Sequence, residues 1–128
     1  MNVDGETRAC VIVADPRGFV RATMRNGIEM TLEDAREAIA TTGKIARDIP
    51  VPVLVDSRLI KSQTREARDY LGSDDAARIC IRVALLIGSP VSRVINNFFL
   101  SQSNKTKVPH RLFTDEAAAI AWLLEAHK

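Results

Sequence analysis

The chain has 128 residues, of which 46% are hydrophobic and 27% charged, a balance typical of one folded domain rather than a disordered segment. Its 18 basic and 16 acidic residues leave a net charge of +2, too small to indicate a nucleic-acid partner. The purely apolar runs, such as Val83 to Ile87, are all far shorter than the roughly 20 residues that span a bilayer. The N-terminus has no secretory signal, so we expect a cytoplasmic protein without a membrane span.

The first half of the chain predicts a β-hairpin, then a helix and a buried strand. Residues 8–13 and 18–24 are rich in β-branched and apolar side chains, and Asp15-Pro16-Arg17-Gly18 between them is a typical tight turn. Thr31 is a helix cap, followed by acidic residues that suit a helix N-terminus. Pro50 and Pro52 end this helical unit, and the run Val53 to Asp56 has the character of a buried parallel strand.

The second half alternates helices and strands. A charged helix is predicted over Arg65–Leu71 with Gly72 as its stop, and a further turn could be capped at Ser73. We then expect an apolar strand over 80–87, an amphipathic helix over 90–99, a last strand over 108–113 and a final helix over 114–124.

This order of elements predicts an α/β fold. We expect an N-terminal β-hairpin leading into a mixed, mostly parallel sheet of about five strands, packed with about four helices. The whole chain, residues 1–128, is predicted to form a single domain, with residues 1–7 as a loose N-terminal segment.

Few residues could support metal or cofactor chemistry. Cys10 and Cys80 both stand in apolar contexts, which predicts buried free thiols. The sequence contains neither CxxC nor HExxH, and only His110 and His127 are available, so we expect no metal. Because GxGxxG and GxxxxGK[ST] are also missing, no nucleotide cofactor is expected.

The segment VDSRLIKSQTRE, residues 55–66, is the best candidate for a functional site. Asp56 ends a strand, where open α/β sheets present their ligands. Ser62 or Thr64 should start the next helix. Four cations surround that start, although positive charges oppose the helix dipole unless an anion or an acidic partner lies close: Arg58, Lys61, Arg65 and Arg68.

Two interpretations of this segment remain open. In the first, Ser62 or Thr64 accepts a phosphoryl group, or the cations bind an anion or a partner. In the second, Ser62 merely caps the helix and the cations form a solvated face, which Glu66 and Asp69 compensate.

Catalysis is the weakest interpretation, and we expect a protein that is not an enzyme. There is no GxSxG elbow, and Asp56 and Ser57 are neighbours whose side chains should point to opposite faces of a strand. Neither histidine has an acidic partner nearby in the sequence. The aromatic residues Phe98, Phe99 and Trp122 are expected in the core; facing outward, they would mark a dimer or ligand surface.

The order of elements resembles the STAS domain, the anti-sigma factor antagonist fold that is grouped with SEC14-like lipid-binding domains. VALLIGSPVSRVINNFF at 83–99 and RLFTDEAAAIAWL at 111–123 look like a set of small uncharacterised bacterial proteins in that group. In antagonist STAS domains a phosphorylatable serine stands in an Asp-Ser-Ser-Gly-like helix start after the strand. The matching region here is 56–64, with Ser62 nearest and Thr64 second, but no acidic residue precedes Ser62 and no glycine follows it.

The resemblance implies a non-enzymatic regulatory or protein-interaction module, with its contact surface around the Asp56–Arg68 loop and helix start. Its partner would be a protein such as a kinase or an anti-sigma-like regulator, and a homodimer is also compatible with the resemblance. The alternative is a small-molecule or lipid carrier of SEC14-like type. That function would need an apolar pocket near the helix that carries Phe98 and Phe99, and a tightly packed core of 128 residues leaves little room for one.

Overall fold

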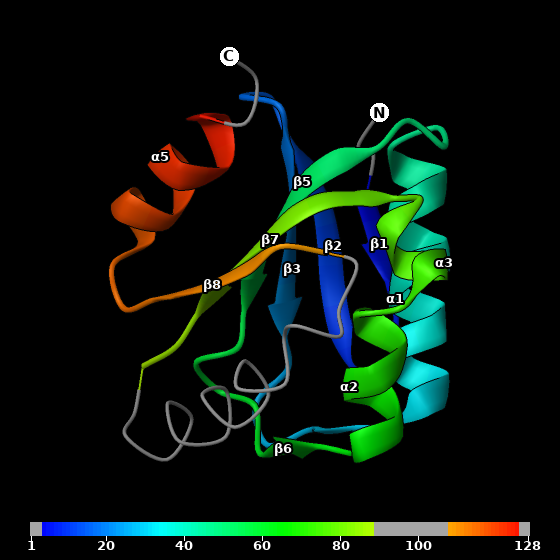
Figure 1. The fold of residues 1–128 in the computed structure, drawn as a ribbon. Helices are drawn as coiled ribbons and strands as arrows, with labels where there is room; N and C mark the ends of the chain where they lie inside the picture. Colours follow the sequence, from blue (N-terminus) through cyan, green and yellow to red (C-terminus); the bar gives the residue numbers. More distant parts are fainter. Residues whose placement is uncertain (1–3, 89–107, 126–128) are drawn as a thin grey trace.

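The computed structural model describes residues 4–88 and 108–125 (Figure 1). Its main feature is a six-stranded sheet in the order β1-β2-β3-β5-β7-β8. The strands are β1 (Asp4–Glu6), β2 (Cys10–Asp15), β3 (Phe19–Met24), β5 (Val51–Asp56), β7 (Cys80–Leu86) and β8 (His110–Phe113). A separate two-stranded ribbon pairs β4 (Glu29–Met30) with β6 (Ser62–Gln63).

Helices cover both faces of the large sheet. α1 (Leu32–Ile45), α2 (Arg65–Leu71) and α3 (Asp74–Ala77) lie on one face, and α5 (Glu116–Glu125) lies on the other (Figure 1). Each face has its own apolar core. One core contains Met24 of β3 and Ala35 of α1, and the other contains Leu54 of β5 and Leu123 of α5.

The predicted N-terminal hairpin is confirmed. β2 pairs with β3 antiparallel, and the amide of Gly18 donates a hydrogen bond of 3.0 Å to the carbonyl of Asp15. Gly18 has a φ of 110°, a conformation that glycine adopts without steric cost. From β3 onward the pairing is parallel, through β5 and β7 to β8, as a mixed and mostly parallel sheet requires.

The sheet has one strand more than expected, and the prediction of a loose segment over residues 1–7 is wrong for Asp4–Glu6. These three residues form β1, which pairs antiparallel with β2. Their sequence, DGE, has no apolar pattern, so an edge strand could not be inferred from it. Gly5 passes directly beneath α1, where a Cβ atom would overlap the methyl group of Thr41.

Strand β5 also begins earlier than the sequence suggests. It includes Val51 and Pro52, which the sequence pattern placed before the strand. The register against β7 shifts between Val51 and Val53, and this irregularity lets a proline, which has no N–H to donate, sit inside a central strand.

The helices form where capping residues predict them. Thr31 and Asp34 make a complete capping box at the start of α1. α2 covers the predicted range and its C-cap is Gly72, while Ser73 caps the short α3. The helix expected over 90–99, with Phe98 and Phe99, lies outside the described residues.

The predicted buried thiols are confirmed, because Cys10 and Cys80 are both buried and free. Trp122 of α5 is half-buried and packs against Phe113 with ring centroids 5.7 Å apart. Arg82 of β7 lies over the Trp122 ring at 4.3 Å and donates a hydrogen bond to the Trp122 carbonyl. Since the last turn of α5 has no basic residue of its own, Arg82 supplies the positive charge that a helix C-terminus favours.

Replacing Gly5 with alanine should destabilise the fold, because the new methyl group must displace Thr41 of α1. We expect a loss of about 1–3 kcal/mol in the free energy of unfolding, measured by urea denaturation. The control is Glu6→Ala in the same strand, which removes only an exposed ion pair and should cost under about 1 kcal/mol. Equal stability of Gly5→Ala and the wild type would show that β1 does not pack beneath α1.

Candidate functional site

Asp56 and Arg58 form a bidentate ion pair, which we call a fork, at the carboxyl end of β5. The Asp56 carboxylate is only 8% exposed, and a buried charge needs a partner. Arg58 supplies it through two side-chain hydrogen bonds of 2.9 and 2.7 Å, and the Arg58 amide adds a third of 3.3 Å. These bonds, the Arg58 guanidinium first, hold the pKa of Asp56 below its ordinary value despite its burial.

The same arginine ties the loop to α5. A guanidinium nitrogen of Arg58 lies 3.8 Å from the carboxylate of Glu116, which also accepts a 2.9 Å bond from Arg21 of β3. The aliphatic part of Arg58 lies close over Gly88, where a Cβ atom would be only 3.1 Å from Cγ of Arg58. Arg58 is therefore directed towards Asp56, Glu116 and Gly88, and not towards Ser62.

The turn that follows, residues 57–61, presents an exposed leucine on a fixed backbone. We call this segment the Leu59 turn. The side chain of Ser57 is buried and its hydroxyl donates to the Leu86 carbonyl. The Leu59 carbonyl accepts a 2.9 Å bond from the Gly27 amide, and the Ile60 amide bonds the Ser57 carbonyl at 3.4 Å. Leu59 itself is 58% exposed.

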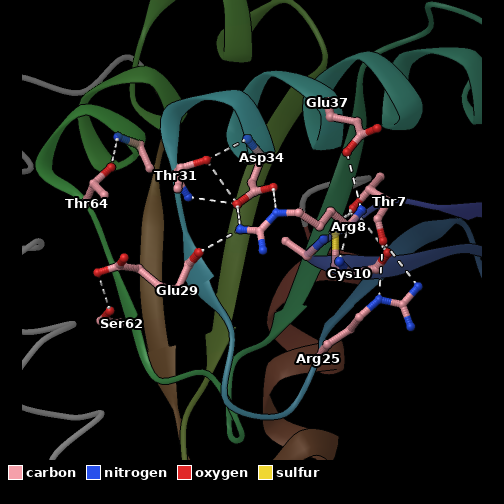
Figure 2. A network of polar contacts seen from close by, with 12 residues as sticks. Thr7, Arg8, Cys10, Arg25, Glu29, Thr31, Asp34, Glu37, Ser62 and Thr64 are labelled. Carbon is pink, nitrogen blue, oxygen red and sulfur yellow. Dashed lines mark hydrogen bonds and ion pairs between the residues drawn. The ribbon is translucent and has the colours of Figure 1, made fainter.

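Ser62 lies in the β4–β6 ribbon, a short distance along the chain from the Leu59 turn (Figure 2). Its hydroxyl donates a 3.1 Å hydrogen bond to the carboxylate of Glu29. Two backbone hydrogen bonds complete the ribbon. The Lys61 amide donates to the Ile28 carbonyl and the Thr64 amide donates to the Met30 carbonyl, each at 2.9 Å. A phosphoryl group on Ser62 would face a carboxylate rather than a cluster of cations.

The helix cap is Thr64, so the interpretation in which Ser62 caps α2 is wrong. The Thr64 hydroxyl accepts a 3.1 Å bond from the Ala67 amide (Figure 2). Thr64 is the residue directly before the first helical position, whereas Ser62 is still in extended, paired backbone. The sequence offered both hydroxyls, and only the strand pairing of Ser62 distinguishes them.

The four cations of the segment divide into different environments. Arg58 is held by Asp56, and Arg68 is half-buried on α2. Lys61 and Arg65 are exposed, and neither forms an ion pair with any residue in the ranges 4–88 and 108–125. The single anion site suggested by the sequence, with all four cations around Ser62, is therefore not formed.

A second polar network, which the sequence did not reveal, holds the other side of Glu29 (Figure 2). Arg8 forms a two-pronged ion pair with the buried Asp34 at the start of α1 and also donates to the Glu29 carbonyl at 3.0 Å. The Arg8 guanidinium lowers the pKa of Asp34 below its ordinary value. Glu29 is thus fixed at its backbone by Arg8 and at its side chain by Ser62.

An apolar pocket lies between the sheet and helices α1 and α2. It has a volume of about 80 Å³, and its lining includes Ala22, Met24, Ala38, Val55 and Leu85. Among the described residues that line it, none is Asp, Glu, Lys or Arg. The volume is well below the roughly 300–1,000 Å³ of typical ligand sites, and below the ~150 Å³ of an engineered cavity that binds benzene.

Asp56, Ser62 and His110 each make separate polar contacts, although Ser62 and His110 both line the apolar pocket. Asp56 bonds Arg58, Ser62 bonds Glu29, and Nδ1 of His110 lies 2.7 Å from the Val108 carbonyl. Within the described part of the chain, no hydrogen bond joins any two of Asp56, Ser62 and His110. Burial also raises the pKa of the Cys80 thiol to about 12, which leaves it protonated and a poor nucleophile near neutral pH.

Among residues 4–88 and 108–125, no group of three or more His, Cys, Asp or Glu residues is arranged to hold a metal ion. In the same ranges no helix has both the length and the apolar character needed to cross a membrane.

The fold places this chain among α/β proteins with the SpoIIAA-like, or STAS-like, fold. A crystal structure of an uncharacterised DUF3478-family protein from Shewanella loihica PV-4, described as having a SpoIIAA-like fold, matches it with a TM-score of 0.58 and 19% identity. The match covers 93% of this chain and 99% of that one. The chain belongs to the family described as domain of unknown function DUF7793, whose model matches residues 14–127. No curated protein matches it.

The Asp56–Arg58 fork has a local sequence signal, the spacing Asp-x-Arg, that is only partly specific. At Asp15 and Arg17, in the hairpin turn, this spacing forms the same fork, with two side-chain bonds of 2.9 Å. At Asp34 and Arg36, inside helix α1, the two residues pair with Arg8 and Glu33 instead. By contrast, Arg8 and Asp34 are 26 residues apart, and no local spacing connects them.

Replacing Asp56 with asparagine should destabilise the protein at pH 7, and by progressively less as the pH falls below about 4 towards the folded-state pKa of Asp56. A carboxyl with a lowered folded-state pKa stabilises the fold above its unfolded pKa of about 3.9, and this contribution disappears as the pH falls through the folded pKa. We expect a loss of about 1–3 kcal/mol at pH 7, measured by urea denaturation across pH 2.5–8. A difference from wild type that stays constant over this range would contradict a role for the ionised carboxylate.

Proposed function

We propose that this protein is a non-enzymatic protein-interaction module of the STAS-like type, and that the Leu59 turn is the centre of its contact surface. The turn follows β5 at the carboxyl end of a parallel strand, the edge at which open α/β sheets place binding loops. It lies within the segment from Asp56 to Arg68 that the resemblance to antagonist STAS domains indicates as a contact region.

The exposure of Leu59 on a fixed backbone is the observation that carries this proposal. A large apolar side chain that is 58% exposed gains free energy when a partner buries it. Hydrogen bonds to Gly27 and within the turn, together with the fork at Asp56, hold the backbone in place before binding. A contact residue that is ordered in advance loses little conformational entropy on association.

The partner suggested by the STAS resemblance is another regulatory protein, such as a kinase or an anti-sigma-like factor, or a second copy of this chain. Phosphorylation of Ser62 would act here by disruption. Placing about −1.5 to −2 charge beside the Glu29 carboxylate would repel it and weaken the β4–β6 ribbon. Thr64 is less suited to modification, because its hydroxyl is already occupied as the cap of α2.

Leu59→Asp should abolish partner binding, with Ile49→Asp as its matched control. Ile49 is exposed to a similar extent, 65%, but precedes β5 and therefore lies at the opposite end of that strand. Affinity capture from lysate of the native host, quantified by mass spectrometry, should show specific partners with wild type and Ile49→Asp and lose them with Leu59→Asp. The same partners at the same abundance with all three proteins would refute a contact surface at Leu59.

A lipid or metabolite carrier is the second candidate, and the apolar pocket favours it. The uncharged lining suits a neutral apolar ligand, but a volume of about 80 Å³ is too small for a lipid chain unless α1 or α2 moves. Phe98 and Phe99, near which a carrier would need its pocket, lie outside the described residues. Because the pocket is small, the carrier function has less support than the protein-interaction function.

Native mass spectrometry of the purified protein distinguishes the two functions. From the pocket volume we expect no lipid or other apolar molecule to remain bound to the wild type. A copurified lipid that disappears in Ala38→Leu, which fills the pocket, while circular dichroism shows that the variant is folded, would establish the carrier function instead.

A further inference from the structure

The Leu59 turn is followed by two positive charges, Lys61 and Arg65, that have no ion-pair partner among the described residues. Lys61 and Arg65 are both exposed, and within residues 4–88 and 108–125 neither lies in an ion pair. Arg58, on the other side of Leu59, differs because Asp56 and Glu116 balance its charge. Lys61 and Arg65 are therefore the cations next to the Leu59 turn that are open to carboxylates of a partner.

The position of Arg65 is unfavourable for the isolated protein. It is the first residue of α2, where the helix dipole disfavours a cation by about 0.3–1 kcal/mol. The other described helices begin with acidic residues and without a cation at that position: Glu33 and Asp34 in α1, Asp74 and Asp75 in α3, and Glu116 in α5. In α2 the acidic residue of the first turn, Glu66, is preceded by Arg65.

We infer that the partner of the Leu59 turn is an acidic protein segment that also offers an apolar side chain. This inference rests on the proposed function and specifies its partner. Carboxylates of such a segment would pair with Lys61 and Arg65, and its apolar residue would bury Leu59. The pairing would also remove the unfavourable contact between Arg65 and the dipole of α2.

A membrane surface is a weaker match to the same residues. One exposed leucine provides far less apolar area than a myristoyl chain, and a single myristoyl chain gives only marginal membrane binding. An acidic protein needs no insertion, and complementary charge accelerates its association in a way that salt suppresses.

Selection of peptides tests the inference without knowledge of the natural partner. A random dodecapeptide display library is panned against the wild type, after depletion on Leu59→Asp. The enriched peptides should carry a net negative charge and at least one large apolar residue. Their affinity, measured by fluorescence anisotropy, should fall at least about tenfold for Lys61→Glu/Arg65→Glu and should decrease as salt rises.

The matched control is Lys44→Glu/Arg111→Glu, which makes the same change in charge at two exposed cations of α1 and β8. It should bind the selected peptides within about twofold of wild type, a difference of under about 0.5 kcal/mol. Thermal melts of both double variants confirm that they are folded.

Several outcomes would overturn the acidic partner. They are a lack of enrichment over Leu59→Asp, enrichment of neutral or basic peptides, and equal loss of affinity in both double variants. Binding to vesicles of phosphatidylcholine and phosphatidylserine that needs Leu59 and Lys61, with no peptide enriched, would assign the surface to a membrane. If host partners are lost with Leu59→Asp but kept with Lys61→Glu/Arg65→Glu, the proposed function stands and this inference fails.

Discussion

The buried carboxylate of Asp56 is the constraint around which the candidate surface is arranged. A charge that is 8% exposed at the end of a central strand must be paired, and Arg58 is the residue that reaches it. To do so, the chain turns back directly after β5. Arg58 then lies over Gly88 and approaches Glu116, while the next residue, Leu59, is left pointing into solvent. Arg58 thus connects the end of β5 with α5 and with the residue after β7, Gly88, and it also positions the exposed leucine.

A second set of interactions brings the starts of α1 and α2 together. The β4–β6 ribbon is only two residues long on each strand, yet each strand leads directly to a threonine cap, Thr31 for α1 and Thr64 for α2. Glu29 joins the two sides because Arg8 holds its carbonyl and Ser62 its carboxylate. The Leu59 turn is attached to this ribbon through Lys61 and to the loop after β3 through Gly27. It is therefore supported from two sides, which explains how an exposed loop can present a fixed surface.

The helices and the hairpin were predictable because the sequence signals for them are local. The turn Asp15-Pro16-Arg17-Gly18, the cap at Thr31 and the stop at Gly72 each depend on the conformational preferences of a few neighbouring residues, and all three are confirmed. Strand β1 was not predictable, because an edge strand of sequence DGE owes its conformation to β2 and to the space under α1. The likeness to STAS domains, which rested on element order and on core residues, holds for the fold.

The fold class, the hairpin and the segment that carries the candidate surface could be read from the amino-acid sequence, since hydrophobic periodicity and capping are properties of neighbouring residues. The use of the polar side chains depends instead on the folded structure. That structure paired Arg58 with Asp56 and Glu116, Ser62 with Glu29, and Arg8 with Asp34, and it left Lys61 and Arg65 without a carboxylate in the described part of the chain. Ion pairs and hydrogen bonds depend on distances of a few ångströms between residues from separate elements, and these distances exist only after the chain has folded.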